Sequence, residues 1–145
     1  MKDYKLSSNF KFSELTCTDD KDLKKINQEI AQKNYEQELK TLAEFAEKVR
    51  KIIGSPMIIT SGFRCESLNK KLGGSPTSKH RFCEAIDFIP KNISAFEAFV
   101  KILISGLEFH EVILEKRGNG HLIHIAIGTK MKKLYSPKAG EYNGI

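Results

Sequence analysis

A long stretch of helical periodicity in the first half of the chain limits the folds that are open to it. Between residues 35 and 53, apolar side chains recur every three or four positions and form one stripe along a helix. Asn34 precedes the stripe as a cap, and Gly54 follows it as a helix terminator. A helix with one apolar face has to bury that face against other elements. The stripe comprises Tyr35, Leu39, Leu42, Phe45, Ala46, Val49 and Ile53.

Shorter segments predict further helices. Leu23, Ile26 and Ile30 recur at helical spacing and predict a helix over residues 20–30. Another short helix is predicted over residues 66–72. Ser94, with Glu97 three residues later, has the pattern of a capping box and predicts a helix that runs to Gly106.

Four β-rich runs predict strands, and most of them follow the helices. They cover residues 56–60, 84–89, 110–116 and 121–127. Arg-Gly-Asn-Gly between the last two runs is a hairpin signal. Helices first and then strands, with one helix between them, predict an α+β fold in which helices pack against a small antiparallel sheet.

The length of the chain predicts one domain over residues 1–145. A chain of 145 residues with 40% hydrophobic residues can fill one core, and we find no internal repeat and no low-complexity linker. Residues 1–19 are interpreted as an extended lead-in that Phe10, Phe12 and Leu15 attach to this core. Residues 129–145 form a lysine-rich tail with two open interpretations: disorder, or packing across the sheet through Leu134 and Tyr135.

Composition excludes several classes of protein. No apolar run approaches the roughly 20 residues that cross a bilayer, so membrane insertion is excluded. The polar start contains no signal peptide, and we expect synthesis in the cytoplasm. Lys and Arg (24) outnumber Asp and Glu (18), which gives a net charge of +6 and favours an anionic partner such as a cell-wall surface. Without an arginine-rich arm, an RNA-binding motif or a tryptophan, specific nucleic-acid recognition is not expected.

Two histidines and one aspartate form a candidate metal site. His80 lies in the loop after a glycine-rich turn, Asp87 lies on the strand that follows, and His124 lies on the last predicted strand. Two imidazoles and one carboxylate suit zinc and leave a fourth coordination position for water. The alternative for each residue is a hydrogen-bonded structural role. The three cysteines are an odd number and contain no Cys-x-x-Cys pair, which is typical of reduced thiols rather than a disulfide scaffold.

Three stretches of the chain carry a longer pattern. They are Ile59-Thr-Ser-Gly-Phe-Arg64, then Ser78-Lys-His-Arg-Phe-Cys-Glu-Ala-Ile-Asp87 after an Asn and a Gly-Gly turn, and finally His121-Leu-Ile-His-Ile-Ala-Ile127. The pattern resembles the zinc D-alanyl-D-alanine carboxypeptidase family of peptidoglycan peptidases. In that family a Ser-Gly-Tyr-Arg-like strand end leads to Ser-x-His-x-x-Gly-x-Ala-x-Asp, and a later strand supplies a second histidine. The lead-in Asn9-Phe-Lys-Phe-Ser-Glu-Leu-Thr-Cys17 is similar to small phage-type members. The resemblance covers about residues 7–128.

The resemblance implies a fold, a cofactor and a cleft. The fold is the α+β arrangement of zinc D-Ala-D-Ala peptidases and hedgehog-like domains. The resemblance implies that His80, Asp87 and His124 hold Zn²⁺, and that Arg64 and Ser78 line the substrate cleft. The guanidinium of Arg64 can bind a peptide carboxylate through two hydrogen bonds, and its alternative role is a structural salt bridge. Ser78 has the alternative role of bracing the turn before His80.

Hydrolysis of this kind also needs a general base that takes a proton from the zinc-bound water. His121 stands three residues before the second zinc histidine, where related enzymes often carry Glu or His. Glu115 stands where phage-type relatives often carry an acid. If the hairpin has a tight loop, Glu115 faces Leu122 and Ile113 faces His124. Glu115 then shares a face with His124 across a diagonal of roughly 7–8 Å, and His121 points to the other face. A shift of the register by one residue would reverse this assignment. We favour Glu115 as the base, with His121 as the second choice.

Two positions depart from the family pattern. Cys83 stands where relatives carry Gly, so the loop has to differ or be strained if that position needs a positive φ. Cys83 also lies three residues after His80, a spacing compatible with metal binding, and its alternative is an inert buried thiol. Leu122 replaces a common aromatic residue, which alters the cleft wall and not the zinc site.

The function that the resemblance implies is a zinc metallopeptidase that hydrolyses amide bonds in peptidoglycan stem peptides. Carboxypeptidase and endopeptidase action both remain open: Arg64 as a carboxylate clamp favours the first, and the phage-like lead-in favours the second. We expect a phage or prophage product, such as an endolysin acting on the host cell wall, or a virion-associated protein. The alternative is a non-catalytic cell-wall or protein-binding domain on the same scaffold. The oligomeric state stays open.

Overall fold

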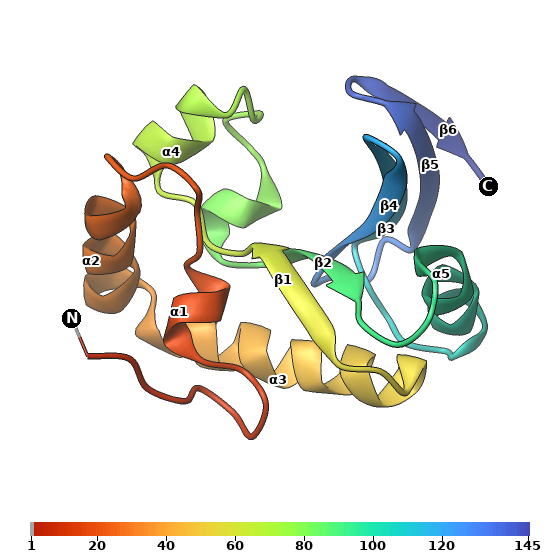
Figure 1. Cartoon of the computed structure of the whole chain (residues 1–145), viewed down its shortest axis with the longest axis horizontal. Coiled ribbons are helices and arrows are strands. Elements are labelled where there is room, and N and C mark those ends of the chain that lie inside the picture. The colour runs from red at the N-terminus through yellow and green to blue at the C-terminus, as the bar shows by residue number, and fades with distance from the viewer. Residues whose placement is uncertain (1) are drawn as a thin grey trace. The chain divides into compact units, whose positions relative to one another are not determined.

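The computed structural model describes residues 2–145 and contains five α-helices, one short 3₁₀ helix and six strands. Figure 1 shows their order along the chain. The helices are α1 (Phe12–Leu15), α2 (Lys24–Asn34), α3 (Glu36–Ile53), α4 (Glu66–Lys71), the 3₁₀ helix η1 (Lys79–Phe82) and α5 (Ala95–Ile104). The strands are β1 (Met57–Ser61), β2 (Ala85–Pro90), β3 (Glu111–Arg117), β4 (Gly120–Ala126), β5 (Lys132–Lys138) and β6 (Glu141–Gly144).

The predicted helices and strands and the α+β class are confirmed, and the sheet is larger than expected. The predicted cap of the long helix is wrong, because Asn34 is the last residue of α2 and α3 begins at Glu36. Its strand order is β1-β2-β4-β3-β5-β6. The pairs β3–β4 and β5–β6 are antiparallel, whereas β5 runs parallel to β3, so the sheet is mostly rather than wholly antiparallel. The two last strands lie in the tail: Leu134 pairs with Ile113 and Tyr135 pairs with Leu114. The tail is therefore ordered, but it does not pack across the sheet: it extends the sheet by two strands, which neither interpretation predicted.

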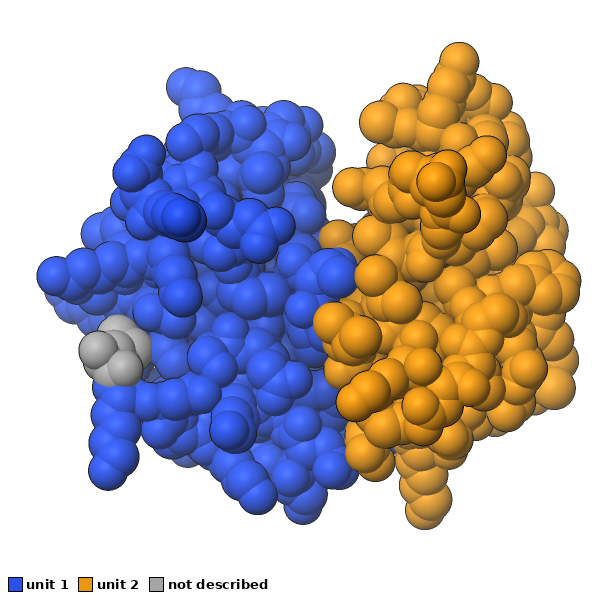
Figure 2. Space-filling model, viewed as in Figure 1, with its two compact units in different colours: residues 1–47, 59–86 blue, residues 48–58, 87–145 orange. Residues whose placement is uncertain are grey.

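The chain folds into two compact units, which Figure 2 distinguishes by colour. Unit 1 consists of the chain up to Glu47 together with Ile59–Ile86, and unit 2 of Lys48–Ile58 together with Asp87–Ile145. The single domain over residues 1–145 stays a prediction. In residues 2–145, no helix combines the length and the apolar character needed to cross a membrane.

Unit 1 is built around the part of the α3 stripe that precedes Lys48 and around a buried asparagine. Leu39 and Leu42 of the stripe are fully buried, as are Phe10, Phe12 and Leu15 of the predicted lead-in, where α1 forms. In α2 the buried face carries Asn27 and Ala31, while Ile26 is exposed, so the predicted stripe of this helix is displaced. Asn27 faces the interior because its side-chain amide makes three hydrogen bonds there. It donates to the carbonyls of Thr16 and Phe63 and accepts from the backbone amide of Cys65.

Unit 2 is built around the β3–β4 hairpin and α5. Ser94 caps α5 by accepting a hydrogen bond from the backbone amide of Glu97 at 3.0 Å, as the capping-box pattern predicts. Phe99 and Ile102 of α5 are buried, and so are Val112 and Ile123 of the hairpin. Helix α5 packs against β3 and β4. The hairpin thereby has one face covered by α5, and its other face carries the polar side chains described next.

Candidate metal centre

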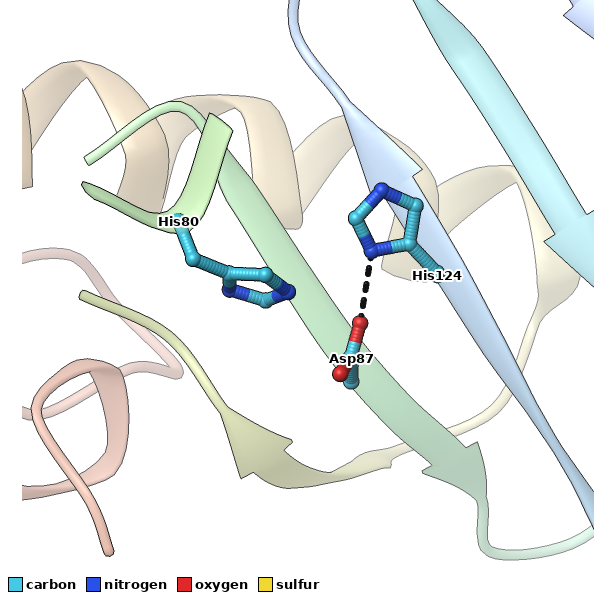
Figure 3. A group of neighbouring side chains, drawn as sticks. All are labelled: His80, Asp87 and His124. Carbon is cyan, nitrogen blue, oxygen red and sulfur yellow. Dashed lines mark hydrogen bonds and ion pairs between the residues drawn. The ribbon is translucent and has the colours of Figure 1, made fainter. Parts of the chain in front are cut away.

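Asp87 and His124 form a buried pair. Asp87 lies in β2 and His124 in β4, and their exposed fractions are 5% and 8%. Nδ1 of His124 lies 2.8 Å from Oδ1 of Asp87 (Figure 3). Burying a carboxylate is costly unless it has a partner, so this contact indicates a built polar site rather than a chance approach.

His124 is also held on its other side. Its Nε2 lies 3.0 Å from Oε1 of Glu111, which is the first residue of β3. Burial by itself would lower the pKa of His124, but the hydrogen bonds with Asp87 and Glu111 outweigh burial and raise the pKa to about 10. The hydrogen bond from His124 in turn lowers the pKa of Glu111, although burial opposes this. The ring of His124 therefore lies between two carboxylates.

His80 is oriented by the backbone of the Ser-Gly-Phe-Arg stretch. It lies in η1 and is 3% exposed. Its Nδ1 lies 2.7 Å from the carbonyl oxygen of Gly62, which can only accept, so Nδ1 carries the proton and donates. In the neutral ring this leaves the lone pair on Nε2, the atom that can bind a metal. The backbone carbonyl of His80 accepts from the amide of Arg64 at 3.0 Å, which ties the same two segments together again.

Two glycines, Gly62 and Gly74, permit close packing around the loop that carries His80. Gly62 passes so close to Leu15 that a Cβ at this position would lie 2.3 Å from the Leu15 carbonyl oxygen. In the turn before η1, a Cβ on Gly74 would lie 2.1 Å from Oδ1 of Asn69. The Asn69 amide donates to the carbonyl of Ser75 and closes this turn. The small residues thus permit close packing of backbone and side chains that fixes the loop carrying His80.

The three predicted ligands come together. His80, Asp87 and His124 each offer one ligand atom, and these atoms all lie within 4.8 Å of one another (Figure 3). Around a tetrahedral zinc, ligand atoms stand about 3.4 Å apart, given metal–ligand bonds of about 2.1 Å. All three residues are buried, and two imidazoles with one carboxylate fit the donor preference of zinc. The group is therefore suited to one divalent cation.

Cys83 does not belong to this group in the described part of the chain, residues 2–145. Its side chain is 1% exposed and forms no disulfide. Burial raises the pKa of the thiol to about 12, which is typical of an inert cysteine. Its backbone has φ 59° and ψ 38°, the left-handed conformation at the end of η1. Cys83 thus has the backbone conformation that favours glycine, and of the two possibilities considered for this loop the structure shows a strained residue.

The hairpin register places Glu115 on the same face as His124. Glu115 pairs with Leu122 and Ile113 pairs with His124, as expected for a tight loop. Because side chains alternate along a strand, Glu111, Ile113 and Glu115 share this face. Glu115 is 8% exposed, and its Oε2 accepts from Arg117 at 2.7 Å. The carboxylate is buried, paired and on the face of the metal group.

His121 lies on the opposite face of the hairpin. Its ring centroid is 6.4 Å from that of Tyr135, and both residues line an apolar pocket of about 510 Å³ together with Phe99 and Leu103 of α5. The structure thus brings Glu115, but not His121, to the side of the sheet that carries His124.

Arg64 and Ser78 contribute to the segments that hold His80. The Oγ atom of Ser78 accepts from the backbone amide of His80 at 3.3 Å and so caps η1, which is the bracing role considered for it. The Nε atom of Arg64 donates to Oγ of Ser61 at 3.0 Å. Contact with substrate stays a prediction for both residues.

Glu111 and Tyr142 are two residues that the sequence did not single out. Glu111 contacts His124 directly. It lies two residues before Ile113, the partner of His124, so extending the predicted register by two residues would have placed Glu111 on the His124 face. Tyr142 lies in β6 and is 54% exposed. Partial burial raises its pKa most, the charges of Glu115, Glu111 and Asp87 raise it further, and Arg117 opposes them. No motif pointed to Tyr142, because the tail was not predicted as a pair of strands.

Comparison with known proteins identifies the family. The family model described as Peptidase M15 matches residues 8–126, and no curated protein matches the chain. The match covers most of the chain and includes all three residues of the metal group. Together with an α+β fold and a buried His-Asp-His group suited to zinc, the match shows that this chain belongs to the peptidase M15 family of zinc-dependent metallopeptidases.

Proposed function

We propose that the chain is a zinc peptidase that hydrolyses amide bonds in the stem peptides of bacterial peptidoglycan. The observation that carries this proposal is the buried group of His80, Asp87 and His124 in a chain of the M15 family. The choice of peptidoglycan rests on the motif resemblance around Arg64, His80 and His124. The net charge of +6 is compatible with an anionic cell wall.

Each residue of the site has a distinct proposed role. His80, Asp87 and His124 hold the zinc ion, which when bound supplies a Lewis acid and lowers the pKa of water to about 7. Glu115 takes the proton released by the attacking water and delivers it to the leaving amine. Its position on the His124 face supports this role, and the contact with Arg117 fixes the carboxylate.

Arg64 is proposed to recognise the substrate. A guanidinium can bind a carboxylate through two parallel hydrogen bonds, which suits the free end of a D-Ala-D-Ala stem. Loss of such a clamp would weaken a carboxypeptidase more than an endopeptidase, because only the former needs a terminal carboxylate. The origin as a phage or prophage endolysin, or as part of a virion, stays a prediction.

Mass spectrometry of stem peptides tests the reaction and the bond together. Digestion of purified peptidoglycan should release either free D-alanine or new amino termini, and a chelator should stop the release. Metal analysis should find one zinc per chain, lost in His80→Ala and in Asp87→Asn. A wild-type protein that binds zinc and cleaves no wall fragment would favour the wall-binding or protein-binding domain instead.

The assignment of the base has its own prediction. Glu115→Gln should lower kcat by about 10²–10⁴-fold and leave zinc content unchanged, because the amide cannot take the proton. His121→Ala should retain most of the activity, since His121 lies on the α5 side of the hairpin. The measurement is the rate of stem-peptide cleavage by both variants at equal zinc loading. If His121→Ala is the inactive variant, the base is His121.

A further inference from the structure

Glu111 is not one of the possible metal ligands, but it contacts one of them, His124. It is the first residue of β3 and pairs with Ala126, and it lies on the same face of the hairpin as Ile113, the partner of His124. Its side chain is 22% exposed, compared with 10% for the side chain of His124. Glu111 thus reaches His124 diagonally from the neighbouring strand.

The two nitrogens of His124 have different partners. Nδ1 lies 2.8 Å from Asp87 Oδ1, and Nε2 lies 3.0 Å from Glu111 Oε1. Asp87 belongs to the group that can hold a metal, and Glu111 does not. The Nδ1 atom therefore faces the group, while Nε2 faces a carboxylate that accepts a hydrogen bond from it.

His80 has the opposite arrangement. Its Nδ1 donates to the Gly62 carbonyl at 2.7 Å, so that Nε2 is its metal-binding atom. Outside the group of possible metal ligands, each histidine has an acceptor on one ring nitrogen: a backbone carbonyl on Nδ1 of His80 and the Glu111 carboxylate on Nε2 of His124. Acceptors of this kind fix the tautomer and the ring orientation of a ligand histidine and make it more basic.

We propose that Glu111 is a positioning residue that keeps the proton on Nε2 of His124 and so makes Nδ1 the metal-binding atom. The proposal builds on the metal site proposed above and on no property of the substrate. Removal of the acceptor lets the imidazole rotate or bind through either nitrogen, which weakens the site. Partners of this kind change metal affinity by about 10–100-fold when they are lost.

Competition for zinc against a chromophoric chelator measures this effect without any substrate. Glu111→Ala should bind zinc about 10–100-fold more weakly than the wild type. Glu111→Gln should recover most of this affinity, because the amide oxygen still accepts from Nε2. The matched control is Glu108→Gln, which removes an exposed carboxylate three residues away and should leave the affinity unchanged. Equal zinc affinity in the wild type and Glu111→Ala would overturn the proposal.

The ring nitrogens can be observed directly in the wild-type protein, which needs no variant to fold. Long-range ¹H–¹⁵N spectra of the zinc-loaded protein should show His124 with a metal-bound Nδ1 and a protonated Nε2, and His80 with the reverse. Metal bound to Nε2 of His124 would overturn the proposal. A wild-type protein that binds no zinc would overturn this proposal and the metal site together. A protein that binds zinc as described but cleaves no stem peptide would support the role of Glu111 and contradict only the proposed reaction.

Discussion

Gly62 has two contacts that both depend on its missing side chain. It approaches Leu15 so closely that a Cβ would lie 2.3 Å from the Leu15 carbonyl oxygen. From this position its own carbonyl accepts the hydrogen bond from Nδ1 of His80. The same residue thus permits the close approach of two backbone segments and orients a candidate zinc ligand. This is the physical reason for a glycine in the Ser-Gly-Phe-Arg motif.

Cys83 is the reverse case, a residue with a side chain where glycine would be less strained. An L-residue in the left-handed region costs about 1–2 kcal/mol because Cβ approaches the following carbonyl oxygen. Replacing Cys83 by glycine changes the stability of the protein in two opposite ways. Loss of the buried thiol lowers stability, whereas relief of the strain at a φ of 59° raises it. A comparison of two variants that both lack the sulfur separates the two effects.

Cys83→Gly should therefore be more stable than Cys83→Ala by about 1 kcal/mol, since alanine keeps the Cβ in the left-handed conformation. Urea unfolding of both variants measures the difference, provided that the dependence on urea concentration is equal. If alanine is as stable as glycine, the loop after η1 has a different backbone conformation.

At the scale of elements, the β3–β4 hairpin decides which side chains meet at the metal group. Its two-residue loop consists of Gly118 and Asn119, and Gly118 has a φ of 58° whereas Asn119 has no positive φ. A positive φ at only the first loop position is what a type II′ turn requires. The turn fixes the register, and the register places Glu111 and Glu115 beside His124.

Gly118→Ala should destabilise the protein by about 1–2 kcal/mol, because an L-residue is strained at this φ. No atom lies within 4 Å of a Cβ built on Gly118, so the cost is conformational and not steric. Asn119→Ala is the matched control in the same loop and should change stability much less. Thermal or urea unfolding of the two variants tests this, and equal effects would show that the loop does not have this turn type.

The hairpin and the long helix could be predicted because each is encoded in local sequence, whereas the candidate metal ligands were identified through the resemblance of longer motifs to a known family. Period, turn residues and the spacing of alternating side chains gave the register on which Glu115 and His124 share a face. The strands β5 and β6 could not be predicted from the sequence, because the tail is rich in lysine, contains Pro137 and shows no apolar alternation. The parallel pairing of β5 with β3 depends on long-range contacts that no local signal reports. The buried face of α2 was missed for a related reason, because Asn27 is buried by hydrogen bonds with distant backbone groups.

At the scale of the molecule, the proposed zinc ligands come from positions 80, 87 and 124. The last two stand 37 residues apart in the chain, and they meet only in the folded protein. A metal that binds the folded chain and not the unfolded chain stabilises folding by mass action. His124 lies between Asp87 and Glu111, so both of its ring nitrogens have a carboxylate partner within the protein itself.

Zinc should therefore raise the melting temperature of the wild-type protein. At a free concentration 1,000 times Kd the stabilisation is about 4 kcal/mol, which for a chain of this size corresponds to a shift of about 10 °C. His80→Ala removes one ligand and should melt at nearly the same temperature with and without zinc, while the His124–Asp87 contact persists within unit 2. Differential scanning calorimetry of both proteins, with zinc or with a chelator, makes the comparison. The same zinc-dependent shift in His80→Ala would show that the stabilising ion binds elsewhere, because a site that has lost one of three protein ligands cannot retain the full binding free energy.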